Sequence, residues 1–176
     1  QELVQALLDT GKPVVVVLMN GRPLTISKLT EQVPAIVEGW FLGTETGNAI
    51  ADVLLGKYNP SGKLTMSFPR NVGQIPVFYN YRQSGRPGTD KLTKWTNRFI
   101  DSPVSPLYPF GYGLSYTTFS YSAPRVSQKE FSTNEILKVS VDVTNTGQYD
   151  GEETIQLYIR DVICLLYTSP SPRDRT

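Results

Sequence analysis

The side chains best suited to contact a ligand lie in one short loop at positions 43–47, with the sequence Gly-Thr-Glu-Thr-Gly. Thr44, Glu45 and Thr46 offer hydroxyl and carboxylate groups that can hydrogen-bond a hydroxyl-rich ligand or a facing protein surface. The glycine at each end allows the backbone to approach another surface closely. The loop follows an apolar run that predicts a parallel strand, and open α/β sheets bind ligands at the carboxyl ends of such strands. We therefore predict a binding or contact role for this loop.

Each nearby carboxylate also has a purely structural interpretation. Glu45 precedes an expected helix, where a negative charge interacts favourably with the helix dipole. Glu38 follows the apolar run at a strand end and is expected to hydrogen-bond the backbone rather than to react. Asp52 falls within the expected helix, opposite its apolar face, and is expected to be solvated or ion-paired.

Composition excludes several kinds of chemistry and partner. The 176 residues include no histidine, so neither a serine or cysteine nucleophile paired with histidine nor a histidine-ligated metal can form within the chain. Cys164 is the only cysteine, so no disulfide forms within the chain. The net charge of +1 gives no indication of nucleic-acid binding. No apolar run approaches the ~20 residues of a membrane span. We predict no metal, nucleic-acid or membrane partner.

The loop lies within a stretch, 38–69, that reads as strand end, loop, helix, turn and strand. Gly56 stands where a left-handed residue would end the helix, and Asn-Pro-Ser-Gly at 59–62 is a strong turn signal. Apolar and polar residues alternate over 64–68, as in a half-buried strand. Four apolar residues fall on one face of the helix, namely Ala49, Ile50, Val53 and Leu54.

The residues upstream predict an α/β arrangement with parallel strands. Glu2–Leu8 has the pattern of a short amphipathic helix. Val14–Met19 is a continuous apolar run, typical of a strand covered on both faces, and Ala35–Val37 is the next strand. A partly helical segment ending at Gln32 joins the two strands, which gives the alternation of a parallel α/β sheet.

The downstream residues change character twice. Residues 71–112 mix proline, glycine and aromatic residues without a period, which predicts an extended connector whose aromatic rings fix it to a neighbouring surface or line a cleft. Alternating apolar residues over 137–143 and 155–159 predict strands with one buried face. Residues 163–176 (ICLLYTSPSPRDRT) have no period, and we predict that they are not native to the protein.

Two strings in the sequence resemble a known family. GTETGNAIADVLLGKYNPSGKLTMSFPRNVGQIP and the later YPFGYGLSYTTF are similar to the C-terminal part of family 3 glycoside hydrolases, the β-glucosidase group. The resemblance covers roughly Gln1–Val162. It implies a partial α/β sandwich domain with parallel strands at residues 1–70, the extended connector at 71–112, and the start of a fibronectin type III-like, immunoglobulin-like β-sandwich at 113–162. Residues 163–176 do not continue the family pattern and form the predicted non-native tail.

The resemblance implies that the complete protein hydrolyses terminal non-reducing β-D-glucosyl residues with retention and without a cofactor. That reaction needs two carboxyl groups about 5–5.5 Å apart. In this family the nucleophile is an aspartate in an N-terminal barrel domain, and the acid/base is a glutamate upstream of the residue matching Gln1. Neither position exists in this sequence, so no catalytic residue is assigned. The expected partners are a β-glucoside or oligosaccharide and the barrel domain, in the periplasm or outside the cell.

Within this framework, Trp40 and the loop residues Thr44, Glu45 and Thr46 are candidates for substrate binding or for a domain interface. The flat apolar face of Trp40 suits either a pyranose ring or a neighbouring domain. The alternative for the chain as a whole is a non-catalytic accessory module that supports a separate catalytic domain, because fold alone does not confer function.

Overall fold

The structure is a computed structural model that describes every residue except 1, 82–87, 89–96, 133 and 160–176. The predicted tail at 163–176 lies outside the described residues, as does the end of the predicted fibronectin-like segment. The chain divides into two compact units. The first unit comprises Gln1–Glu45, Leu64–Tyr112 and Gln156–Thr176, and the second comprises Thr46–Lys63 and Gly113–Ile155.

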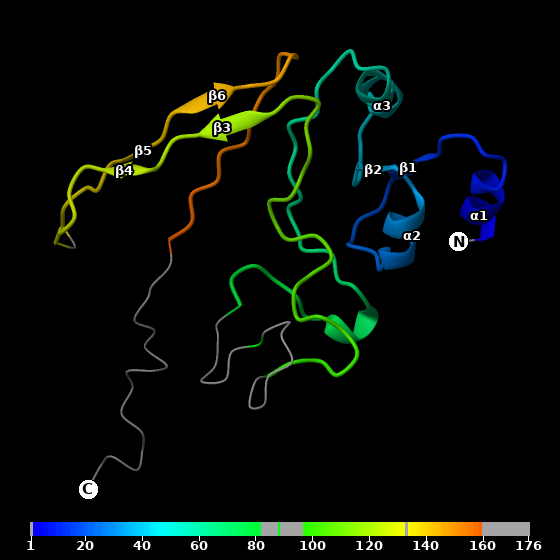
Figure 1. Cartoon of the computed structure of the whole chain (residues 1–176), viewed down its shortest axis with the longest axis horizontal. Helices are drawn as coiled ribbons and strands as arrows, with labels where there is room; N and C mark the ends of the chain where they lie inside the picture. The colour runs from blue at the N-terminus through cyan, green and yellow to red at the C-terminus, as the bar shows by residue number, and fades with distance from the viewer. Residues whose placement is uncertain (1, 82–87, 89–96, 133, 160–176) are drawn as a thin grey trace, which may run out of the picture. The chain divides into compact units, whose positions relative to one another are not determined.

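The first unit begins with the predicted α/β elements, which Figure 1 shows in blue and cyan. They are helix α1, strand β1, helix α2 and strand β2, at Glu2–Leu8, Val15–Leu18, Ser27–Gln32 and Ala35–Glu38. The two strands are parallel, with Val15 opposite Ala35, which confirms the α/β character. Burial of β1 on both faces was a wrong expectation, because Val15 is 45% exposed. Among the described residues β1 has a ladder partner only in β2.

The segment 64–68 runs beside 107–112 but does not form the predicted strand. Backbone bonds join the two segments at Leu64 and Phe68, yet the only bridge is Phe68 opposite Tyr108. The expected alternation is also wrong, since Met66 is 49% exposed and Ser67 is buried. The Ser67 hydroxyl can be buried at low cost because its Oγ accepts a hydrogen bond from the backbone N–H of Phe110, at 3.2 Å.

A short 3-10 helix, η1 (Val72–Gln74), begins the predicted connector. Gln74 is 3% exposed. Its side chain forms hydrogen bonds with the backbone just before η1 and with the backbone near the far end of the connector. Its Oε1 accepts from the Arg70 N–H, and its Nε2 donates to three carbonyl oxygens, those of Pro103, Val104 and Ser105. Among the described residues the buried apolar core is small and consists of Ile26, Val33 and Phe68.

The second unit begins with helix α3 (Thr46–Leu54), which ends as predicted. Gly56 has φ +71°, the left-handed conformation that glycine adopts without strain. The turn at 59–62 then contacts two other segments of the same unit through Asn59. Asn59 accepts hydrogen bonds from the Ser115 hydroxyl and the Tyr116 N–H, both at 2.8 Å, and donates to the Asp150 carbonyl at 3.0 Å. The turn is therefore held by its own asparagine side chain.

Four short strands of the second unit form one long interrupted hairpin (Figure 1). They are β3, β4, β5 and β6, at Phe119–Tyr121, Arg125–Val126, Val139–Ser140 and Val143–Asn145. Strand β3 pairs with β6 and β4 pairs with β5, both antiparallel. The register shifts by one residue between the two ladders, so Ala123 and Pro124 oppose the single residue Val141. This is the geometry of a β-bulge, and it divides the strand predicted over 137–143 into two.

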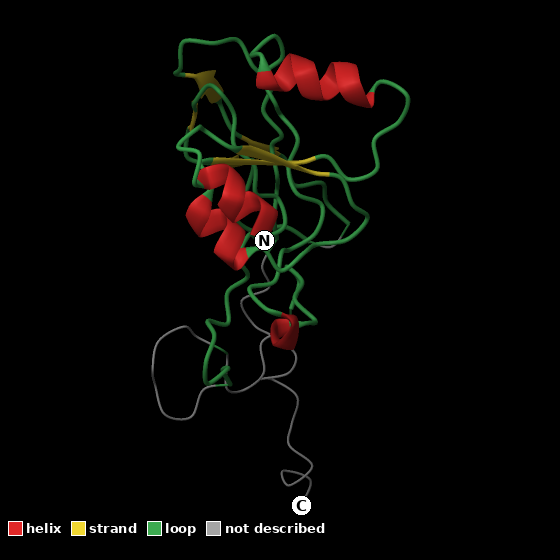
Figure 2. Ribbon diagram, turned by 90° about the vertical axis from the view of Figure 1, so that its right-hand side faces the viewer, coloured by secondary structure: helices red, strands yellow, loops and turns green. Residues whose placement is uncertain are grey.

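The strand predicted over 155–159 is absent from the described structure, whose strands are short and joined by long loops (Figure 2). Leu157 is 68% exposed and Ile159 is 95% exposed, so the expected buried face is wrong. A strand is defined by its ladder partner, and none of the described residues pairs with this run. The fibronectin-like β-sandwich therefore stays a prediction.

Candidate functional site at the carboxyl edge of β1 and β2

The carboxyl ends of β1 and β2 are joined beyond their last ladder pair, Leu18 and Glu38. The Gly39 N–H donates to the Leu18 carbonyl at 2.8 Å. The Asn20 side-chain amide donates to Glu38 Oε2 at 3.5 Å, while its Oδ1 accepts from the Arg22 N–H at 3.2 Å. Side chains from both strand ends thus meet at the edge where open α/β sheets bind ligands.

Glu38 bonds the backbone, as the sequence predicts. Its Oε1 accepts a hydrogen bond from the Trp40 N–H at 3.0 Å, so each carboxylate oxygen has a donor. Partial burial raises the pKa of the Glu38 carboxyl above its ordinary value, and the hydrogen bonds from Trp40 and Asn20 oppose that rise. The group is therefore a hydrogen-bonding centre at the strand ends.

Trp40 lies between this hydrogen-bonding centre and an aromatic cluster. It is half-buried, and its ring centroid lies 5.9 Å from that of Phe68 at an interplanar angle of 50°. Phe68, which is 2% exposed, contacts the ring of Tyr108 edge-on, and Tyr108 contacts Tyr112 at 4.9 Å. The indole therefore packs against Phe68 within the first unit, while Trp40 as a whole is only partly buried.

The predicted loop residues follow Trp40 in the chain. Thr44 and Glu45 form an exposed turn, and Thr46 is the half-buried first residue of α3. This position of Glu45 fits both interpretations of its carboxylate, the binding role and the favourable interaction with the helix dipole. The binding or interface role of Trp40, Thr44, Glu45 and Thr46 stays a prediction.

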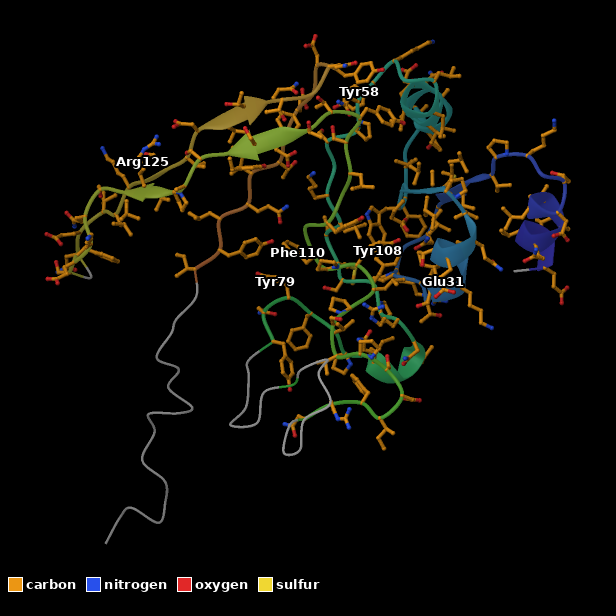
Figure 3. All side chains as sticks on the ribbon, viewed as in Figure 1. Glu31, Tyr58, Tyr79, Tyr108, Phe110 and Arg125 are labelled. Atoms are coloured by element: carbon orange, nitrogen blue, oxygen red, sulfur yellow. The ribbon has the colours of Figure 1, made fainter. Side chains whose placement is uncertain are left out.

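A second aromatic cluster lies in the predicted connector and includes residues labelled in Figure 3. The rings of Tyr79 and Phe110 stack at 4.5 Å with an interplanar angle of 25°. Tyr158 contacts Tyr79 edge-on at 6.1 Å. The stacking shows that these aromatic rings pack against one another, while Tyr79 still exposes 60% of its surface.

Sequence reasoning missed the part that Asn20 plays. Asn-Gly after a strand is a turn signal, and Asn20 does bond the Arg22 N–H. Its second partner, Glu38, is 18 positions away, and only the parallel register of β1 and β2 brings the two together. The signal available in the sequence was a polar residue immediately after each of two adjacent parallel strands.

The described residues also bear on metals and membranes. Within the described ranges, no group of three or more histidine, cysteine, aspartate or glutamate side chains is placed to hold a metal ion. No helix in the described part is long and apolar enough to span a bilayer.

Comparison with known proteins identifies the family of this chain. The glycosyl hydrolase family 3 C-terminal domain matches residues 1–116. A periplasmic β-glucosidase from Salmonella typhimurium is 55% identical over 163 residues, which are 92% of this chain and 21% of the relative. A β-xylosidase from Formosa agariphila is 50% identical over 161 residues, again 92% of this chain and 21% of the relative.

Solved structures agree with the sequence comparison. The crystal structure of a β-glucosidase from Listeria innocua in complex with glucose matches with a TM-score of 0.85 and 45% identity, over 93% of this chain and 23% of that one. The chain belongs to glycosyl hydrolase family 3, and its α/β elements are part of the C-terminal domain of that family. It spans about a fifth of the length of the curated relatives that it matches.

Proposed function

We propose that the complete protein containing this chain is a retaining β-glucosidase that removes terminal non-reducing β-D-glucosyl residues from glucosides or oligosaccharides. The 55% identity to a periplasmic β-glucosidase carries this proposal. The likeness to a β-glucosidase solved with glucose supports it. The name of the periplasmic relative, together with the family resemblance, also supports a periplasmic or secreted location for the protein.

Within that enzyme, the chain supplies a domain that borders the active site rather than the reacting carboxyl groups. Both oxygens of Glu38 are hydrogen-bonded to Trp40 and Asn20, which suits a positioning role better than nucleophilic attack. Glu45 is exposed in a turn after the carboxyl edge of β2. Trp40, Thr44, Glu45 and Thr46 accordingly face the substrate or the barrel domain, and the nucleophile and the acid/base lie outside this chain.

Assays of the complete protein and of the 176-residue chain test this proposal together. The complete protein should release the aryl group from an aryl β-glucoside, and an aryl β-xyloside should be assayed in parallel because one relative is a β-xylosidase. The chain alone should release none from either. Turnover by the chain alone would place the catalytic carboxylates within it. Stable folding without turnover, and no turnover by the complete protein, would favour the accessory module.

Glu45→Ala in the complete protein tests the loop. We expect kcat/KM to fall with little change in thermal stability. A rise in KM with kcat nearly unchanged would indicate sugar binding, and a fall in melting temperature would indicate domain docking. Glu31→Ala is the matched control, since Glu31 is an exposed glutamate on α2 (Figure 3). Equal effects of the two variants would leave Glu45 with the helix-dipole role.

A further inference from the structure

Trp40 has an unusual backbone conformation. Among the described residues it is the only non-glycine residue with a positive φ, at 53°. For a residue with a bulky side chain the left-handed region is unfavourable, because the Cβ lies too close to the following carbonyl oxygen. Such a conformation persists only where surrounding contacts determine it. The contacts that hold Trp40 therefore indicate what its conformation is for.

Two contacts hold Trp40, one through its backbone and one through its ring. The backbone N–H donates to Glu38 Oε1 at 3.0 Å, across the intervening Gly39. The ring contacts Phe68. The backbone contact is itself braced, because Glu38 Oε2 accepts from Asn20 at the end of the neighbouring strand. Asn20 is fixed in turn by the Arg22 N–H. Glu38 thus connects Trp40 to both strand ends.

We propose that Glu38, braced by Asn20, is a positioning residue that holds the half-buried Trp40 in its left-handed conformation and presents its indole to a sugar ring. The identification of the ligand as a sugar rests on the proposed function, whereas the hydrogen-bonded positioning of Trp40 does not. Flat aromatic faces bind pyranose rings through their axial C–H groups, and a ring with fixed orientation binds with a smaller loss of side-chain entropy.

A reciprocal swap of amide and carboxylate tests the brace. Glu38→Gln keeps an oxygen for the Trp40 N–H, but turns its new amide nitrogen toward the donor amide of Asn20. Asn20→Asp instead places two carboxylates face to face. The double variant restores one donor and one acceptor, and the new carboxylate at position 20 still has an oxygen for the Arg22 N–H. Each single variant should loosen Trp40, and the double variant should restore it.

The first readout is Trp40 fluorescence in the 176-residue chain. The sequence has two tryptophans, so Trp95→Phe leaves Trp40 as the sole reporter. Both single variants should shift its emission to the red and increase its quenching by acrylamide, and the double variant should return both toward the parent values. If the single variants leave emission and quenching unchanged, or if the double variant is no closer to the parent than they are, the positioning role is overturned.

The second readout is KM in the complete protein. Glu38→Gln should raise KM for an aryl glucoside by roughly 5- to 30-fold, the factor that corresponds to a loss of one or two kcal/mol. The value of kcat should stay nearly unchanged, and Asn20→Asp in addition should restore KM. Melting temperatures of all variants exclude a merely unfolded enzyme. A loosened Trp40 with unchanged KM would overturn the sugar contact.

The two proposals fail in different ways. If the complete protein hydrolyses no glycoside but the fluorescence swap behaves as expected, the proposed function is wrong and the positioning of Trp40 stands. If hydrolysis is robust and the swap has no effect on fluorescence, the function stands and the positioning is wrong.

Discussion

Lys63 and Glu153 form an ion pair that is largely shielded from solvent. Lys63 Nζ lies 3.2 Å from Glu153 Oε1, and the two side chains are only 13% and 14% exposed. Lys63 also donates to the Gly113 carbonyl at 3.0 Å. The pair therefore ties the residue after the 59–62 turn to the β-strand region of the second unit.

Lys63→Met should destabilise the chain, because it leaves the shielded Glu153 carboxylate without its cation and the Gly113 carbonyl without a donor. We expect a loss of about 1–3 kcal/mol in the free energy of unfolding, measured by urea denaturation. Lys57→Ala is the matched control. Its pair with Asp52 is longer, at 3.7 Å, and exposed, so the change should stay within about 0.5 kcal/mol. Equal losses would mean that shielding of the Lys63 pair adds nothing.

Gly111→Ala should destabilise the first unit for two separable reasons. Gly111 has φ +80°, and an added Cβ would overlap the side-chain amide of Gln156, whose Nε2 donates to the Gly111 carbonyl. Gly11→Ala isolates the first reason, since Gly11 has φ +70° with no atom near its added Cβ. We expect about 1 kcal/mol for Gly11→Ala and about 1 kcal/mol more for Gly111→Ala, because the flexible Gln156 side chain can move aside but loses its hydrogen bond to the Gly111 carbonyl. Thermal denaturation of both variants measures the difference.

The elements that the sequence predicts correctly have a local cause. Helices α1 and α3 follow from apolar residues at helical spacing, and Gly56 ends α3 because only a left-handed residue closes it there. The parallel pairing of β1 with β2 follows from two apolar runs joined by a helical segment. Each of these signals lies within a few residues of the element that it specifies.

The parts that the sequence does not predict depend on contacts between distant residues. The run over 137–143 alternates regularly, yet the insertion opposite Val141 that splits it comes from the partner strand. The burial of Ser67 depends on the N–H of Phe110, 43 residues away. At the candidate site, the prediction for Glu38 is confirmed, but its brace, Asn20, follows the other strand, β1. Period-based reasoning contains no information about such pairings.

Glu38 should make stability depend on pH in a defined direction. Burial raises the pKa of its carboxyl above the ordinary value of 4.5, and the hydrogen bonds only partly offset this. A carboxyl whose folded pKa is raised stabilises the fold below the unfolded pKa, and that contribution is lost as the pH rises through the folded pKa. The stability of wild type relative to Glu38→Gln should therefore fall as the pH rises just above 4.5. Urea denaturation of both proteins across this window measures it, and a flat or rising difference would contradict the assignment.

The tail at 163–176 should contribute nothing to folding, if it is not native as the sequence predicts. Deleting these residues should change the free energy of unfolding by less than about 0.5 kcal/mol. A deletion of equal length from the other end, through α1, is the control and should destabilise the chain clearly. A loss on removing the tail comparable to that of the control would show that the tail belongs to the protein.

Gln74 should be the most sensitive single position in the connector. Its side chain is 3% exposed, and it satisfies the Arg70 N–H and three successive carbonyls from Pro103 to Ser105. Gln74→Leu has a similar volume but removes the acceptor for the Arg70 N–H and the amide that donates to these carbonyls, so we expect a loss of about 1–3 kcal/mol in the free energy of unfolding. Gln74→Glu should cost more at neutral pH, because its carboxylate turns an acceptor toward three carbonyl oxygens.

Acidification distinguishes this explanation from a loss of shape. A protonated carboxyl can donate one hydrogen bond to the carbonyls, so Gln74→Glu should regain stability as the pH falls, whereas Gln74→Leu should show no such recovery relative to wild type. Asn71→Ala is the control, since Asn71 is exposed on the same turn and its side chain makes no capping bond. If Gln74→Glu and Gln74→Leu respond to pH alike, the hydrogen bonds that the Gln74 amide donates do not account for its effect on stability.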